Sequence, residues 1–272
     1  MRIAFQFYRL LNHLSIDVAA GAMIGALFFS SIFHSVITGF DLGALGLTVW
    51  IIYTLDHLQD AHKIKERAST ARHRFHQDHP RLLIFMVVLA TFLDILFLFF
   101  IRASVVQLGM ALVILVGFYF LAQQNLFFLK EILAAVLYTA GVALPAYAGT
   151  NVSPSLPSIL AILLFLNTAL LNLVIFSWFD RRQDLRHQQP SLVILKGEQK
   201  ARKIILVLFL MGGLLVIFFQ IISQQWVPTL IFLSMNSVLL LIFNVQGYFG
   251  LCDRYRLVGD AIFFLPAFYL MT

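Results

Sequence analysis

The chain has 272 residues, of which 61% are hydrophobic and only 12% are charged, and its mean hydropathy is +0.90. These values exclude a soluble domain and place the chain among integral membrane proteins. The formal net charge is +6, but the basic residues are not interleaved with base-stacking aromatic residues in any recognisable module, so we expect no nucleic-acid partner.

A helix needs about 20 apolar residues to cross the hydrocarbon core of a bilayer. On this length the sequence predicts nine transmembrane helices, at residues 14–36, 42–58, 82–101, 104–122, 130–149, 157–179, 203–223, 227–246 and 257–271. The ninth span is short and begins beside Arg256. We therefore expect an all-α, polytopic helical bundle, formed by a single transmembrane domain over residues 1–272.

Basic residues fall almost entirely in alternate loops of this layout. Of the 19 Lys and Arg residues, 18 lie on the side of the N-terminus, and Arg102 is alone on the other side. Because cytoplasmic loops are enriched in Lys and Arg, we expect a cytoplasmic N-terminus and a C-terminus on the opposite side. In a bacterium the protein would lie in the inner membrane, with a basic face that can attract anionic membrane lipid or a phosphorylated substrate.

Two segments, 59–81 and 181–202, are predicted as long polar cytoplasmic loops, and each follows an apolar helix that ends in two carboxylates. Asp56 and Asp60 form the first acidic pair, and Asp180 and Asp184 form the second. The pairs are 124 residues and four predicted spans apart, which is typical of two pseudo-repeated halves with a shared site where they meet. Residues four apart lie on one face of a helix, so each pair can present two carboxylates to a common point.

Hard carboxylate oxygens suit Mg²⁺, which binds through a few carboxylates and keeps water and phosphate oxygens as its other ligands. Both pairs lie at helix C-termini, where the helix dipole disfavours negative charge, so they do not serve as helix caps. We therefore interpret Asp56, Asp60, Asp180 and Asp184 as metal ligands that face a diphosphate through bridging magnesium ions.

The sequence resembles the UbiA superfamily of intramembrane prenyltransferases in three features. These are the spacing of the acidic pairs, their position after the second and sixth spans, and the basic residues that follow them. The second segment, Asp180-Arg181-Arg182-Gln183-Asp184-Leu185-Arg186, is similar to the D-x-x-x-D motif of that family with its basic residue. The first segment, Asp56 to Asp60 followed by Ala61 to Arg67, is similar to the family's D-x-x-x-D motif and its basic tail. Lys130 matches the family's diphosphate-facing lysine. One departure is that Ile52 and Tyr53 stand where the family usually carries Asn and an acidic residue.

The resemblance implies transfer of an isoprenyl chain from its diphosphate to a lipophilic, for instance aromatic, acceptor, with Mg²⁺ as cofactor. The leaving diphosphate would be stabilised by Lys65, Arg67, Arg72 or Lys130. The allylic cation needs an electron-rich wall, for which Tyr53, Trp178 and Phe179 are expected. Further substrate contacts are expected from three more residues, Asn172, Arg181 and Arg186.

Two other functions stay open from the sequence. A terpene cyclase on the same scaffold would ionise the same diphosphate and let the cation close on itself. A transporter is suggested by the repeated halves, although its acidic site would be expected near the midplane rather than at the cytoplasmic ends of helices. A histidine-rich metal centre at His73, His76 and His79 is disfavoured, because the second half of the chain offers only His187 as a counterpart.

Overall fold

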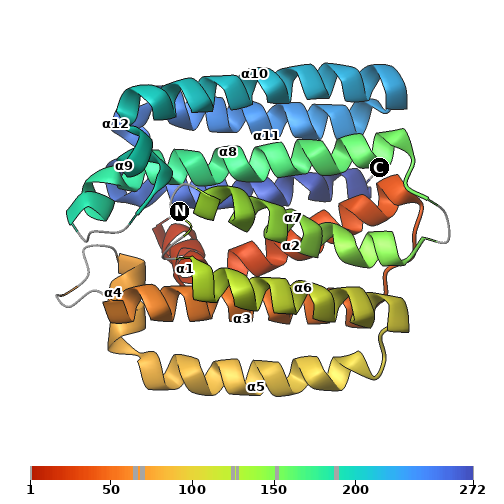
Figure 1. Ribbon diagram of the computed structural model, residues 1–272, viewed down its shortest axis with the longest axis horizontal. Coiled ribbons are helices and arrows are strands. Elements are labelled where there is room, and N and C mark those ends of the chain that lie inside the picture. The colour runs from red at the N-terminus through yellow and green to blue at the C-terminus, as the bar shows by residue number, and fades with distance from the viewer. Residues whose placement is uncertain are drawn as a thin grey trace.

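The computed structural model describes residues 2–63, 67, 71–123, 126, 129–150, 153–186 and 190–271, and every element in these ranges is helical. The long helices run side by side, as Figure 1 shows. In chain order the elements are α1 (Arg2–His13), α2 (Ile16–Phe33), α3 (Gly39–Lys63), α4 (Ala71–Asp78), α5 (Pro80–Leu98), α6 (Ala103–Ala122), α7 (Leu129–Ala148), α8 (Leu156–Arg186), α9 (Leu192–Lys196), α10 (Glu198–Ser223), α11 (Trp226–Asn244), α12 (Gln246–Phe249), the 3₁₀ helix η1 (Leu251–Asp253), α13 (Arg254–Ala261) and the 3₁₀ helix η2 (Ile262–Met271).

Each of the first eight predicted spans corresponds to one long helix, but the two predicted polar loops are partly helical. Helix α3 continues to Lys63 and α8 to Arg186, so both acidic pairs lie within helices, and α4 and α9 form inside the segments that were expected to be loops. The expectation of loops from residue 59 and residue 181 was therefore wrong. Charged residues do not end a helix, because a helix that leaves the hydrocarbon core can continue in water with the same backbone hydrogen bonds.

Seven of the helices that the structure describes are long and apolar enough to cross a membrane, and the protein is an integral membrane protein. They are α2, α5, α6, α7, α8, α10 and α11. Helix α3 has 25 residues but carries Asp41, Asp56, Asp60 and Lys63, and the last predicted span is divided between α13 and η2. The number of nine spans thus stays a prediction.

Helix α2 occupies the centre of the bundle, where it packs against α3, α7, α8 and η2. Small residues allow this close approach: Ala22 and Ala26 have no exposed surface, and a Cβ on Gly25 would lie 2.7 Å from Val142 Cγ1. Small residues at helix interfaces are typical of membrane bundles, in which van der Waals packing drives helix association. By contrast, most of α5 and α6 is exposed, as expected of helices that face lipid.

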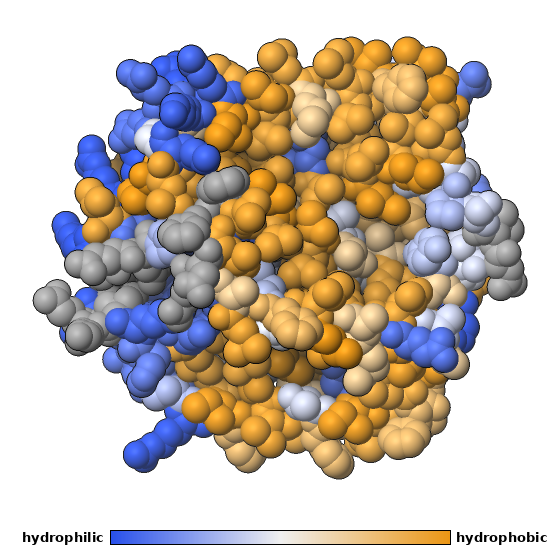
Figure 2. All heavy atoms as spheres, viewed as in Figure 1, coloured by the Kyte–Doolittle hydropathy of each residue, from blue (hydrophilic) through white to orange (hydrophobic). Residues whose placement is uncertain are grey.

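Polar residues gather at one end of the molecule. Figure 2 shows an apolar band across the middle, with the larger hydrophilic region at the end where Figure 1 places α4, α9 and the N-terminus. At the other end, Arg102 donates a hydrogen bond to the Val36 carbonyl oxygen (2.7 Å) and lies 3.9 Å from Asp41. The two polar ends are thus separated by an apolar layer.

We expect the end that carries α4 to be cytoplasmic and the segment before α8 to lie on the opposite side, because basic residues accumulate in cytoplasmic loops. The check is cysteine labelling of Asp78→Cys and Ser153→Cys in a Cys252→Ser background; positions 78 and 153 are both exposed. A membrane-impermeant reagent should label them from opposite sides of sealed vesicles. Labelling of both from one side would contradict this orientation.

Candidate active site

A single cavity of about 570 Å³ brings the two acidic pairs together. Its walls come mainly from α3, α5, α6, α7, α8 and α13, and Asp56, Asp60, Asp180 and Asp184 all line it. On α3 the lining residues extend from Asp41 to Asp60, a stretch of ~28 Å at 1.5 Å per residue. Most of its lining surface is apolar, so the cavity combines an acidic end with a long apolar interior.

The first acidic pair lies in the last turns of α3. Asp60 Oδ1 is 3.4 Å from Lys63 Nζ, one turn further along the helix. Asp56 Oδ1 is buried and has no hydrogen-bond partner among the described residues. A buried carboxylate oxygen without a donor is costly, and a cation at this position would satisfy it.

The second acidic pair lies in the last turns of α8, and residues of α13 hold its leading carboxylate. The Tyr255 hydroxyl donates to Asp180 Oδ1, and Arg256 Nη2 donates to Asp180 Oδ2. Each carboxylate oxygen has two lone pairs, so Asp180 keeps acceptor capacity. Hydrogen bonds of this kind orient metal-binding carboxylates in other proteins.

Lys130, in the first turn of α7, lies between the two acidic pairs. It lines the cavity and interacts electrostatically with Asp56, Asp60 and Asp184. A point charge with three donors at this position is suited to phosphate oxygens. The structure therefore brings Lys130 together with both acidic pairs.

Arg72, predicted to stabilise the diphosphate, also lines the cavity but is already engaged with protein groups. Its Nη1 is 2.9 Å from His57 Nε2, and its Nη2 donates to Asn12 Oδ1 (2.9 Å) and lies 3.5 Å from Asp260 Oδ2. The side chain is nearly buried. Sequence reasoning missed this set of partners because they come from three different helices, α1, α3 and α13.

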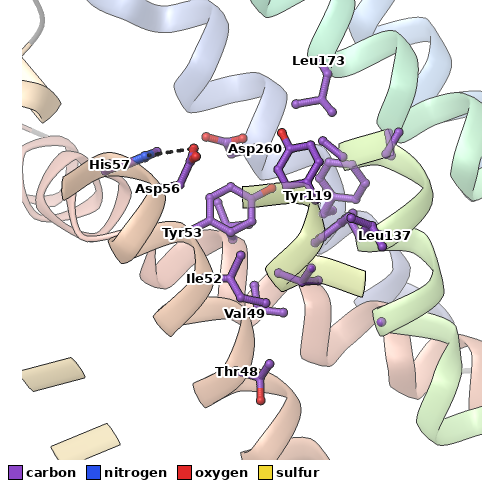
Figure 3. A pocket seen from close by; sticks show the side chains of 18 of the residues that line it. Thr48, Val49, Ile52, Tyr53, Asp56, His57, Tyr119, Leu137, Leu173 and Asp260 are labelled. Carbon is purple, nitrogen blue, oxygen red and sulfur yellow. Dashed lines mark ion pairs between the residues drawn. The ribbon is translucent and has the colours of Figure 1, made fainter. Parts of the chain in front are cut away.

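Tyrosine rings form part of the wall next to the first acidic pair. In Figure 3, Tyr53 of α3 and Tyr119 of α6 lie with Asp56 and Asp260 around one space, and Leu137 and Leu173 lie on its far side. Tyr138 of α7 lines the cavity as well. Tyr53 is therefore placed where an electron-rich wall was expected, and Tyr119 and Tyr138 extend that wall.

Trp178 and Phe179 are placed elsewhere and are not among the residues that line the cavity. Trp178 packs against Phe243 with ring centroids 5.6 Å apart, and Phe179 stacks on Tyr255 at 4.5 Å. Phe176, one turn before Asp180, takes the position at the cavity wall instead.

The other expected substrate contacts are divided between the cavity and the surface. Asn172 is buried, lines the cavity and has an Oδ1 with no hydrogen-bond partner among the described residues. Arg181 points toward α10, where its Nε lies 2.7 Å from Glu198 Oε1. Arg186 and Arg67 are exposed and do not line the cavity, and Lys65 lies outside the described residues.

Of the three histidines considered as a metal centre, His73 and His76 lie on α4, and His79 directly precedes α5. The His76 ring is buried and its Nδ1 is 2.9 Å from the Arg72 carbonyl oxygen, and the ring lies 5.3 Å from that of His57. Burial, with the nearby Arg256, lowers the pKa of His73 to about 4, so this side chain is neutral at pH 7. The neutral His73 and the packed His76 ring agree with a structural role for these two residues.

Across the described ranges, no three His, Cys, Asp or Glu side chains are grouped closely enough to hold a metal ion by themselves. The two acidic pairs fit the smaller demand of Mg²⁺, which takes one or two carboxylates and completes its octahedron with water and phosphate oxygens. The unpartnered Asp56 Oδ1 agrees with this donor set. The acidic pairs thus suit a metal that arrives with a diphosphate.

The chain is similar over nearly its whole length to solved structures of UbiA homologues. No protein-family model and no curated protein sequence matches it. A UbiA homologue from Aeropyrum pernix K1, in its apo form, has a TM-score of 0.67 and 15% identity, with 94% of this chain and 98% of that chain covered. A homologue from Archaeoglobus fulgidus bound to GPP and Mg²⁺ has a TM-score of 0.68 and 10% identity, with 96% and 99% covered.

A digeranylgeranylglyceryl phosphate synthase is also similar, with a TM-score of 0.58, 15% identity and coverage of 98% of this chain and 97% of that chain. The chain therefore has the fold of the UbiA homologues.

Proposed function

We propose that this protein is a magnesium-dependent intramembrane prenyltransferase of the UbiA superfamily, which moves an isoprenyl chain from its diphosphate to a lipophilic acceptor. The observation that carries the proposal is the cavity itself. Two acidic pairs, from α3 and α8, line one end with Lys130 between them, and most of the lining surface of the long cavity is apolar. The charged end of the cavity would bind the diphosphate head of an isoprenyl diphosphate, and the apolar part would bind its apolar tail.

The similar structures support the assignment of the head group. Homologues from Archaeoglobus fulgidus were solved with DMAPP and Mg²⁺ and with GPP and Mg²⁺. Both ligands are isoprenyl diphosphates, and this chain has carboxylates and a lysine to receive the same head group. When bound, Mg²⁺ would act as a Lewis acid on the leaving diphosphate.

In the reaction, the bond between C1 of the isoprenyl chain and the diphosphate oxygen breaks, and its electron pair leaves with the diphosphate. The Lys130 ammonium can donate hydrogen bonds to the oxygens on which charge develops. The allylic cation is left against the ring faces of Tyr53, Tyr119 and Tyr138, whose quadrupoles attract positive charge. The acceptor then forms the new bond at C1 and loses a proton.

The apolar walls keep water from the cation. Leu45, Val49 and Ile52 of α3 line the cavity below the first acidic pair. A cation that meets water is hydrolysed, so exclusion of water directs it to the acceptor. The same walls would hold the isoprenyl chain within the membrane.

We expect purified protein in detergent or nanodiscs to release diphosphate from geranyl and longer isoprenyl diphosphates, only with Mg²⁺ and faster with an acceptor. The acceptors to compare are an aromatic carboxylic acid, a quinol precursor and an isoprenyl glyceryl phosphate. Prenylated product identifies a transferase, whereas diphosphate release with a cyclic hydrocarbon and no need for acceptor identifies a cyclase. No release from any isoprenyl diphosphate would refute the proposal.

A further inference from the structure

Asp260 of α13 has no role in the proposed chemistry, yet it lies buried between two arginines at the acidic end of the cavity. Its Oδ2 is 3.5 Å from Arg72 Nη2 and accepts a hydrogen bond from Asn12 Nδ2 (2.9 Å). Arg256 lies four residues earlier on the same helix and interacts electrostatically with Asp260. Residues four apart share a helical face, so the Asp260 carboxylate lies on the same side of α13 as Arg256 and within 3.5 Å of Arg72.

Arg72 connects Asp260 to the first acidic pair through His57. A guanidinium group can only donate hydrogen bonds, so the contact of 2.9 Å between Arg72 Nη1 and His57 Nε2 requires Nε2 to accept. The imidazole proton is then on Nδ1, which lies 4.0 Å from Asp56 Oδ2. The dashed line in Figure 3 marks this approach of His57 to Asp56. Arg72 thus fixes the tautomer and orientation of the ring beside Asp56.

Arg256 connects Asp260 to the second acidic pair directly, because its Nη2 donates to Asp180 Oδ2. Tyr255 beside it donates to Asp180 Oδ1. Arg256 therefore orients Asp180 directly, whereas Arg72 acts on the His57 ring that lies beside Asp56. Asp260 lies 3.5 Å from Arg72 and interacts electrostatically with Arg256. The two arginines do not occupy corresponding positions in the two halves of the sequence, since Arg72 belongs to α4 and Arg256 to α13.

Resting on the proposed function, we propose that Asp260 is a positioning residue that holds Arg72 and Arg256 and thereby sets the relative placement of Asp56 and Asp180. The two aspartates come from helices far apart in the sequence but must meet one diphosphate. A site of this kind requires geometry held within about 0.5 Å. Without the Asp260 charge, two like-charged guanidinium groups would repel each other and turn toward the nearest remaining carboxylates.

The test is the binding of inorganic pyrophosphate in the presence of Mg²⁺, measured by isothermal titration calorimetry on the full chain in nanodiscs. Asp260→Asn should weaken the Kd by at least ~10-fold, because loss of an orienting partner typically costs 10- to 100-fold in metal affinity. Asp260→Glu, which restores the charge, should recover most of this loss. A role in folding alone would lower the Tm without moving the Kd of the folded protein.

A double-mutant cycle separates action through Arg72 from a general loss of charge. If Asp260 acts through Arg72, the effects of Asp260→Asn and Arg72→Met on the pyrophosphate Kd should be clearly non-additive. Asp78→Asn is the matched control: it removes the same charge from α4, the helix of Arg72, but from an exposed side chain, and it should leave the Kd unchanged.

The possible failures are distinguishable. If the wild type binds no magnesium pyrophosphate, the proposed function fails. If the wild type binds it and Asp260→Asn binds it equally well, or if Asp78→Asn weakens it as much as Asp260→Asn does, only the positioning role of Asp260 is overturned. Additive effects in the double-mutant cycle would likewise remove the link through Arg72.

Discussion

Asp180→Asn should lower kcat/KM for diphosphate release by at least ~10³-fold, which corresponds to about 4 kcal/mol of transition-state stabilisation. Asn keeps the volume and can still accept a hydrogen bond from Tyr255. It loses the negative charge that would hold Mg²⁺ against the leaving group, and it also leaves Arg256 without its ion-pair partner. The loss should appear mainly in kcat, because the metal contact strengthens as charge develops on the diphosphate.

Single-turnover release of diphosphate by Asp180→Asn and by wild type measures this effect. Glu198→Gln is the matched control, because Glu198 forms an ion pair with Arg181 away from the cavity and is well exposed. It should keep activity within about twofold, in line with the small contribution of exposed ion pairs. Near-normal turnover by a folded Asp180→Asn variant would place the chemistry elsewhere in the molecule.

The second large effect is expected from Lys130→Met, which should reduce kcat/KM by roughly 10²- to 10³-fold, as the loss of one electrostatic donor to a developing anion does in other enzymes. Met fills a similar volume but offers no donor to phosphate. Removal of the ammonium group also takes away a cation that interacts with Asp56, Asp60 and Asp184. The KM for the diphosphate should therefore rise and kcat should fall.

Steady-state kinetics with geranyl diphosphate resolve the two parameters. Lys130→Arg should recover part of the activity, because the charge returns with a different geometry. Lys200→Met removes a basic residue that is exposed in the first turn of α10 and should behave as wild type. Equal losses in Lys130→Met and Lys200→Met would indicate a general effect of net charge and exclude a specific role for Lys130.

The sequence predicted the helices and the acidic pairs because both leave strong local signals. Apolar runs of about 20 residues identify the spans, and carboxylates four apart identify a shared helical face. The prediction of Tyr53 followed the same geometry, since it lies three residues before Asp56 on the face that lines the cavity.

The same rule explains why Trp178 and Phe179 were poor choices. At 100° per residue, Trp178 lies about 200° and Phe179 about 100° around the helix from Asp180, whereas Phe176 is four residues before it and shares its face. This signal was present in the sequence and would have selected Phe176, which lines the cavity.

The arginine partners could not be predicted in this way. Arg72 and Asp260 are 188 residues apart in the chain, and Tyr255 reaches Asp180 across 75 residues. Such pairs depend on how α4 and α13 pack against the bundle, and no local periodicity encodes that arrangement. Arg72 looked like a free cation for this reason, although its donors are committed to His57, Asn12 and Asp260.

Because η2 is a 3₁₀ helix, residues Arg254–Met271 extend further along the helix axis than an α-helix with the same number of residues would. An α-helix over Arg254–Met271 would be ~27 Å long, at 1.5 Å per residue. With eight residues in α13 and ten in η2, at ~2.0 Å per residue for the latter, the segment extends ~32 Å, close to the ~30 Å hydrocarbon thickness. If this segment forms the predicted ninth span, its extended geometry brings the residues after Pro266 to the face of the bilayer opposite Arg256.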